Sequence, residues 1–496
     1  MWAGFSNGGG SGRPQGWGVA SRMALQLGPH ELQHVFSFLE ARDLLRAAQV
    51  NKVWNEVSMT NELWRQLCLR RWAPCKALPV VLGTQTWRQY YFCRSELEFR
   101  VKSGRPQDFI CKAISGHTGT IDQLAYVSPH EYRFDEKARS VVCTVSSDCT
   151  VRAWDLQEGT EMWSSPVQPA PLVNLVAYPQ LQLVVTVDTQ GLIRGWNTDT
   201  GSEWAFFSLP TSCSSMEACD HPEGSFLLVA CAEGTLYTMT VPQLQVVFRV
   251  ATFPHTPVSL MCSPDKQWVL VSAQDSDLGP KVFYTQPLLH PSEDRLPASA
   301  TLPIRLSSRA CWAPDEAARL MVTHRDDSGV HLVITTFELK ANKSRDRVSI
   351  LGPRLPSDPA HLWVRAGAVQ HSRPAADGLP GPPEAHHVCV GGECGTPFWD
   401  MLAALGNPWL ELTGLLFKDP DRVITAALDL SLCVYVWNKE NTSPILKSCY
   451  HLLGGSHRWA SGFTHVKSDS RSIAGVEARS TGTSILRSYC YKVQLG

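Results

Sequence analysis

The chain has 496 residues, of which 45 are Lys or Arg and 46 are Asp or Glu, so its formal net charge is −1. This balance argues against the strongly basic surface that binds nucleic acid or a membrane, and no apolar run approaches the roughly 18 residues of a membrane-spanning helix. The length suffices for one large domain and at least one small one. Sixteen cysteines without C-x-x-C pairs, and no secretory leader, predict an intracellular protein with reduced thiols, cytoplasmic and/or nuclear.

The first part of the chain changes from low complexity to helical periodicity. Residues 1–22 are rich in Gly and Ser and have no apolar period, which predicts a disordered extension. Apolar residues then recur from Leu32 to Leu39 at i, i+3, i+4 and i+7, the spacing of one stripe on an amphipathic helix. Asp43 is a candidate cap for a second helix that begins at Leu44, since its carboxylate can accept the free N–H groups of a first turn.

Two further helices are expected before residue 72. One carries an apolar face around Trp54, and Thr60 or Asn61 is a candidate cap for the other, which includes Trp64. Fewer than about fifty residues cannot bury this many large apolar side chains unaided. We therefore expect part of this apolar surface to face a partner. An ordinary helical subdomain packed on the rest of the chain is the alternative that periodicity alone leaves open.

The residues of this stretch also fall at the spacing of a known motif. They include Leu27, Pro29, Glu31, Leu32, Phe38, Leu39, Leu44, Leu45, Val50, Lys52, Trp54, Leu63 and Trp64. On these residues, 23–72 resembles an F-box, the helical module that ties a substrate receptor to the Skp adaptor of a cullin ubiquitin ligase. The resemblance implies an adaptor-binding surface and its supporting core, formed by Leu27, Pro29, Leu32, Val35, Phe36, Leu39, Leu44, Leu45, Trp54, Leu63 and Trp64.

Residues 73–105 are expected to form a helical linker. A connector is followed by a segment with apolar anchors at Trp87, Tyr90, Tyr91 and Phe92, which favours a helix. F-box proteins with a propeller carry a similar helical neck, and there it serves as a rigid spacer. A plain packing helix is equally compatible with the pattern.

From 106 to 496 the pattern is one of short strands separated by turn signals. The clearest unit runs from Gly116–His117 to Trp154–Asp155, a GH…WD arrangement at the length of one blade of a β-propeller. Because a buried carboxylate needs hydrogen-bond donors, four residues of this unit are interpreted as the structural tetrad of a WD-repeat blade. They are His117, Ser146, Asp148 and Trp154.

Later units are degenerate but keep the period, and together they resemble a WD-repeat propeller. Eight blades are favoured, with residues 385–392 as the strand of an intermediate blade, and seven blades plus an insertion are the alternative. A strand near 109–114 is expected to complete the last blade and so close the ring. The predicted fold class is α+β multidomain, in which a small all-α F-box domain is joined by a helical neck to an all-β WD-repeat propeller.

Residue clusters that could support chemistry are sparse. His386, His387, Cys389 and Cys394 have acceptable zinc-ligand types, but their spacing fits no structural zinc pattern, so no metal site is predicted. No G-x-S-x-G elbow, P-loop or dinucleotide-binding fingerprint is present. We therefore expect a protein that is not an enzyme and uses no cofactor.

The substrate-binding residues are left unassigned. The candidate loops are Asp275–Gly279 and His324–Gly329, and Arg152 and Arg194 occupy matching blade positions without forming an arginine ring for phosphate. By resemblance, the chain is expected to act as the substrate-recognition subunit of a Skp–cullin–F-box ubiquitin ligase. Its expected partners are the Skp adaptor, through it a cullin scaffold, and an unknown protein substrate, with no nucleic acid and no membrane. The alternatives are a non-degradative WD-repeat scaffold and, last, a hydrolytic or zinc enzyme built on a propeller.

Overall fold

The structure is a computed structural model that describes residues 27–72, 82–83, 85–129, 132–135, 138–221, 223–273, 279–290, 299–304, 307–312, 319–325, 332–342, 347–351, 412–419, 422–427, 432–438, 445–452 and 460–493. The chain divides into a helical unit, Met1–Ser95 with Tyr132–Glu136 and Gln494–Gly496, and a β-rich unit, Glu96–Glu131 with Lys137–Val493. Among the described residues, no helix has the length and apolar character needed to cross a bilayer.

Five helices occupy the N-terminal region, and their starts follow local capping chemistry. They are α1 Pro29–Phe36, α2 Ala41–Ala47, α3 Lys52–Ser58, α4 Asn61–Arg71 and α5 Trp87–Ser103, the last of which contributes residues to both units. Pro29 opens α1, where its missing N–H is no loss. The Asn51 side chain accepts a hydrogen bond from the Trp54 N–H at 2.9 Å and so caps α3.

Two capping predictions need correction. Asp43 does not cap α2, because the extended backbone of Glu40 starts that helix at Ala41 and leaves Asp43 in the first turn. There Asp43 forms an ion pair with Arg46 at 3.0 Å, and its charge also suits the helix N-terminus. Thr60 is the N-cap residue of α4, as expected, but its hydroxyl donates to the Val57 carbonyl instead of accepting from the helix.

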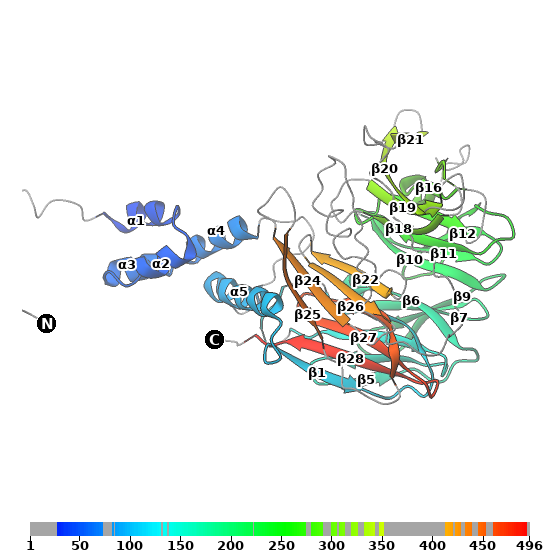
Figure 1. Ribbon diagram of the computed structural model, residues 1–496, viewed down its shortest axis with the longest axis horizontal. Coiled ribbons are helices and arrows are strands. Elements are labelled where there is room, and N and C mark those ends of the chain that lie inside the picture. Colours follow the sequence, from blue (N-terminus) through cyan, green and yellow to red (C-terminus); the bar gives the residue numbers. More distant parts are fainter. Residues whose placement is uncertain are drawn as a thin grey trace, which may run out of the picture. The chain divides into compact units, whose positions relative to one another are not determined.

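The β-rich unit consists of antiparallel four-stranded sheets, each built from strands that follow one another along the chain, with one exception. The exception is the sheet of β1 Phe109–Ile114 with β26 Ala460–Ser468, β27 Ser472–Arg479 and β28 Ser484–Tyr491, which joins the two ends of the unit (Figure 1). Phe109 of β1 pairs with Tyr491 of β28, and the register continues to the pair Ile114 and Leu486. The predicted closure of the ring by the strand at 109–114 is confirmed.

The other sheets follow in chain order. The first of them comprises β2 Ile121–Tyr126, β3 Val141–Ser146, β4 Val151–Asp155 and β5 Thr160–Ser164. The second comprises β6 Leu172–Tyr178, β7 Leu183–Asp188, β8 Leu192–Asn197 and β9 Glu203–Ser208. The third comprises β10 Cys213–His221, β11 Gly224–Cys231, β12 Thr235–Thr240 and β13 Val246–Ala251. The next three comprise β14 Val258–Cys262, β15 Trp268–Ala273, β16 Lys281–Tyr284 and β17 Ser299–Thr301; β18 Ser307–Trp312, β19 Arg319–Arg325, β20 Leu332–Asn342 and β21 Arg347–Leu351; β22 Leu412–Asp419, β23 Arg422–Ala427, β24 Leu432–Asn438 and β25 Ile445–His451. Two short helices, η1 Pro179–Leu181 and α6 Gln286–Leu289, interrupt the strands.

The described residues thus form seven blades of an all-β propeller, the count that the sequence leaves as the alternative to eight. The segment 385–392, predicted to belong to an intermediate blade, lies outside the described residues. Buried side chains fill the spaces between neighbouring blades. Trp154 packs with Val476 of the closing blade, and Trp196 packs with Val145 of the blade before its own. Since one sheet cannot bury its faces alone, these contacts make neighbouring blades depend on one another.

Candidate functional site: the α1–α3 surface and the propeller

The predicted adaptor-binding residues separate into two groups by exposure. Leu32 and Phe36 of α1 are each 2% exposed, and the Phe36 ring meets the Trp54 ring edge-on at 5.2 Å between centroids. Burial of these apolar side chains holds the three short helices together. Of the predicted set, Leu32, Phe36, Leu44, Leu63 and Trp64 are buried, Leu39, Leu45 and Trp54 are half-buried, and Leu27, Pro29 and Val35 are exposed.

Six large apolar side chains between residues 27 and 59 remain exposed. Phe38 is the most exposed of them at 72%, and its ring meets the His34 ring edge-on at 5.3 Å between centroids. Isolated exposed apolar residues are ordinary, but this many on a small bundle indicates a surface that a partner covers. We call the set the α1–α3 apolar surface: Leu27, Val35, Phe38, Val50, Val53 and Met59.

Four residues of this surface are not among the predicted adaptor-binding residues. They are Phe38, Val50, Val53 and Met59. Phe38 follows the end of α1 at Phe36, so the helical stripe that selected Leu32 and Val35 does not include it. Phe38 and Val50 are among the residues at motif spacing, so the motif could have identified them as adaptor-binding residues.

Trp64 belongs to the interior of the helical unit. It is 1% exposed, its indole N–H donates to the Ser58 carbonyl at 2.8 Å, and its ring packs against Tyr91 at 5.4 Å. The Asn61 side chain accepts from the Trp87 N–H at 3.0 Å, so α4 is tied to the first turn of α5. Trp64 therefore supports the helices from within and cannot itself contact an adaptor.

A continuous hydrogen-bond chain runs through the first blade, and it corrects one member of the predicted tetrad. The Trp154 indole N–H donates to the Thr144 hydroxyl at 2.8 Å, Thr144 Oγ1 lies 2.8 Å from His117 Nε2, and His117 Nδ1 lies 2.8 Å from Asp148 Oδ2. Ser146 stands outside this chain, because its hydroxyl accepts from the Asp148 N–H at 3.1 Å. Thr144, two residues earlier on the same face of β3, is the residue that reaches the indole.

The electrostatics of this chain follow from burial and hydrogen bonding. Burial alone would raise the pKa of Asp148, but hydrogen bonds from Thr150 and His117 outweigh it and lower the pKa to about 2. Burial lowers the pKa of His117, although Asp148 opposes that effect. Because Asp148 only accepts, His117 donates from Nδ1 and accepts at Nε2 from the Thr144 hydroxyl. Every polar group is occupied by its neighbour, as expected of a structural brace.

The second blade repeats parts of this arrangement. The Trp196 indole N–H donates to the Thr186 hydroxyl at 2.9 Å. The arginines at matching positions also have matching partners: Arg152 pairs with Glu161 at 2.8 Å, and Arg194 pairs with Glu203. Each guanidinium is thus neutralised within its own blade.

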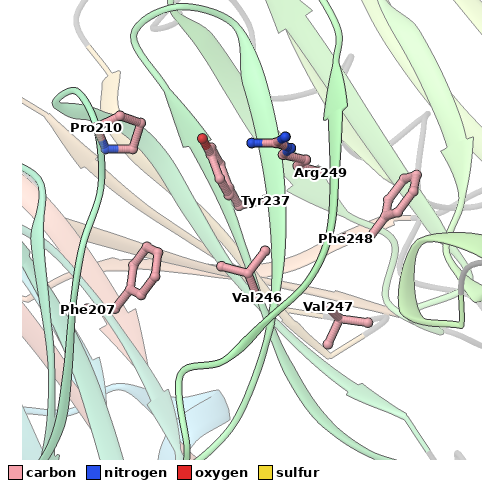
Figure 2. Close-up of a pocket in the computed structure, with 7 residues that line it drawn as sticks. All are labelled: Phe207, Pro210, Tyr237, Val246, Val247, Phe248 and Arg249. Carbon is pink, nitrogen blue, oxygen red and sulfur yellow. The ribbon is translucent and has the colours of Figure 1, made fainter.

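One surface cavity lies where the second and third blades adjoin, and it has a volume of about 550 Å³. Figure 2 shows side chains from the outer strands β9 and β13 and from β12 facing it. Its lining offers one hydroxyl, from Tyr237, and one guanidinium, from Arg249, and no thiol, carboxylate or imidazole. The lining residues are Phe207, Pro210, Tyr237, Val246, Val247, Phe248 and Arg249.

Other sequence-level candidates fall outside the part of the chain that the structure describes. They are the soft-ligand cluster at 386–394, most of the loop 275–279 and most of the loop 324–329. Among described thiols, burial raises the pKa of Cys68 and Cys213 to about 12, which keeps them as poor nucleophiles at neutral pH.

Comparison with known proteins places this arrangement in a family. The F-box-like family model matches residues 29–70, the segment that carries α1 to α4. The chain is 34% identical over 479 residues to human F-box/WD repeat-containing protein 12, covering 94% of this chain and 99% of that protein. It is 29% identical over 437 residues to mouse F-box/WD repeat-containing protein 15, covering 87% of this chain and 91% of that protein.

Among solved structures, the crystal structure of the RRP9 WD40 repeats covers 77% of this chain and 97% of its own, with a TM-score of 0.44 and 11% identity. That likeness is too distant to support an argument. The family model at residues 29–70 and the identity over nearly the full length of the human relative are sufficient. The chain belongs to the F-box/WD repeat-containing protein family.

Proposed function

We propose that this chain is the substrate-recognition subunit of a Skp–cullin–F-box ubiquitin ligase. The observation that carries the proposal is the F-box-like match over residues 29–70, where the same helices leave the α1–α3 apolar surface uncovered. An adaptor that covers Phe38 and Val53 would remove this surface from water, the main driving force for such an association. The F-box then occupies 23–72, the linker 73–105 and the propeller 106–496.

In this role the chain performs no bond chemistry. It binds the Skp adaptor, and through it a cullin, with its helices, and it binds a protein substrate with its propeller. Its contribution is effective concentration, because a substrate lysine held near a charged ubiquitin-conjugating enzyme reacts as if in an intramolecular step.

The test is co-expression of the full chain with the Skp adaptor, followed by size-exclusion chromatography. The informative variant is Phe38→Asp, which puts a charge on the α1–α3 apolar surface without touching the buried core. Its matched control is Phe206→Asp, at a phenylalanine of β9 that is 68% exposed. We expect the wild type and the control to co-elute with the adaptor, and Phe38→Asp to elute alone.

Two outcomes would change the proposal. A folded wild-type chain that does not bind the adaptor would refute it. A chain that binds the adaptor, but whose loss from cells leaves every protein at its former level, would favour the non-degradative scaffold instead. Leu32 and Trp64 are unsuitable positions for this test, because both are buried and their substitution would unfold the helices.

A further inference from the structure

Three potential metal ligands meet on the propeller between its third and fourth blades. His221 ends β10, Glu223 lies in the turn before β11, and His290 directly follows α6. One ligand atom from each side chain lies within 4.8 Å of the other two. The residues come from distant parts of the chain, so their meeting depends on the fold.

The turn that carries two of the ligands is well braced. His221 and Gly224 are register partners at the end of the hairpin, and the next pair is Asp220 and Ser225. The Ser225 hydroxyl donates to the Asp220 carboxylate at 2.7 Å, which closes the hairpin just behind the ligands. The backbone of this turn thus holds His221 and Glu223 on a defined support.

The third ligand is held by the core between the third and fourth blades. His290 caps the C-terminus of α6, its N–H donates to the Gln286 carbonyl at 2.9 Å, and the two residues before it, Leu288 and Leu289, are 0% and 1% exposed. The His290 ring rests edge-on against Phe226 at 5.8 Å. Phe226 belongs to β11, so the imidazole is packed against the hairpin that carries the other ligands.

The distances suit a tetrahedral ion. His290 Nε2 lies 2.6 Å from a Glu223 carboxylate oxygen, and the His221 and His290 ring centroids are 6.2 Å apart. Two ligands on one tetrahedral zinc ion are separated by about 3.4 Å, since each bond is about 2.0–2.1 Å long. All three ligand atoms lie within 4.8 Å of one another, and binding one ion requires the His290–Glu223 separation to widen from 2.6 Å to about 3.4 Å.

The composition of the cluster favours zinc over harder cations. Two imidazoles and one carboxylate form a donor set that zinc uses with three protein ligands and one open position. The side chains of His290 and Glu223 are 43% and 55% exposed, which leaves water access to a fourth position.

We propose that His221, Glu223 and His290 bind one Zn²⁺ ion, which links the β10–β11 hairpin of the third blade to the chain after α6 in the fourth. Water fills the remaining position. The ion clamps two neighbouring blades together, and its site is independent of adaptor binding by the helical unit.

The experiment is zinc binding to the purified full chain after treatment with a chelator. Zinc is titrated in competition with a chromophoric chelator, and bound zinc is counted by atomic emission after dialysis. The variants are His221→Ala and His290→Ala. The control is His255→Asn, because His255 is exposed, lies outside the cluster and has a φ of 59° that asparagine tolerates. A second control, His386→Ala, addresses the cluster of His and Cys residues at 386–394.

We expect one zinc ion per wild-type chain, the same in His255→Asn and His386→Ala, and affinity at least about 100-fold weaker in His221→Ala and His290→Ala. We also expect Zn²⁺ to raise the melting temperature of the wild type and not that of His290→Ala, because a ligand that binds only the folded state stabilises it. Equal zinc binding by all variants would overturn the proposal, and so would loss of zinc in His386→Ala alone. Circular dichroism of each variant verifies that it is folded.

Discussion

Replacing Thr144 by valine tests the hydrogen-bond chain of the first blade. Valine has nearly the same shape as threonine, so the change removes the hydroxyl while the packing around it stays. Thr144 is 0% exposed, and its hydroxyl bonds both the Trp154 indole and the His117 ring. In the variant, a buried indole N–H has no acceptor and a buried imidazole nitrogen has no donor.

The expected cost follows from these two orphaned groups. Leaving one buried polar group without a partner costs about 1–3 kcal/mol, so Thr144→Val should lower the free energy of unfolding by about 2–6 kcal/mol. Ser146→Ala removes a single bond to the Asp148 N–H at 3.1 Å, for which we expect about 1 kcal/mol. The two variants therefore differ severalfold, although both remove one hydroxyl from β3.

Urea denaturation followed by circular dichroism measures both free energies on the full chain. Equal slopes of the unfolding free energy against urea verify that the variants unfold over the same surface. If Ser146→Ala proves as costly as Thr144→Val or more so, the chain through Thr144 is wrong, and the tetrad predicted from sequence is restored. Thr186→Val removes the equivalent hydroxyl of the second blade. Its loss of unfolding free energy should lie between those of Ser146→Ala and Thr144→Val, because only the Trp196 indole loses its partner.

Three further outcomes are expected. Arg487→Met should lower the free energy of unfolding by about 3–5 kcal/mol, because it leaves the buried Glu477 carboxylate, 2.7 Å away, without its cation. The double variant Arg487→Met with Glu477→Leu should be much closer to the wild type in urea denaturation. An equal loss of stability in the single and double variants would contradict this reasoning. Gly234→Ala should lower the melting temperature, because Gly234 has a φ of 77° and an added Cβ would lie 1.7 Å from the Phe253 carbonyl oxygen. An unchanged melting temperature would show that the turn can move. Burial lowers the pKa of His117 from its ordinary 6.5, so the unfolded chain binds the proton at a higher pH than the folded chain does. The free energy of unfolding should therefore fall as the pH drops below about 6.5. In His117→Gln this fall should be less steep.

Local patterns in the sequence determine the identity of the helical segment. Residues at motif spacing between Leu27 and Trp64 suffice to place four helices and to indicate the F-box-like match that the family comparison confirms. The sequence does not determine where α2 starts, because an acidic residue is compatible with both the cap and the first turn. An acidic residue in the first turn, such as Asp43, stabilises a helix nearly as well as one at the cap.

Exposure within that segment is decided by tertiary packing. Phe36 and Phe38 are two residues apart and chemically identical, yet one is 2% and the other 72% exposed. The helical stripe includes Phe36 and omits Phe38, but it also includes Val35, which is 47% exposed, so periodicity alone does not separate surface from core. The placement of the α1–α3 apolar surface therefore needed the structure.

The propeller shows the same division. The GH…WD unit and the repeat period were sufficient to predict blades, because strand alternation and turn chemistry are local. The pairing of residues 109–114 with the C-terminal strand was predicted from the resemblance to a closed propeller. The hydrogen-bond partner of the Trp154 indole could not be predicted in this way. Thr144 and Ser146 lie on the same face of one strand, and only the depth of packing selects between them. Nor could any spacing reveal His221, Glu223 and His290 together. Sequence determines what is local, and contacts between distant segments arise only when neighbouring blades pack.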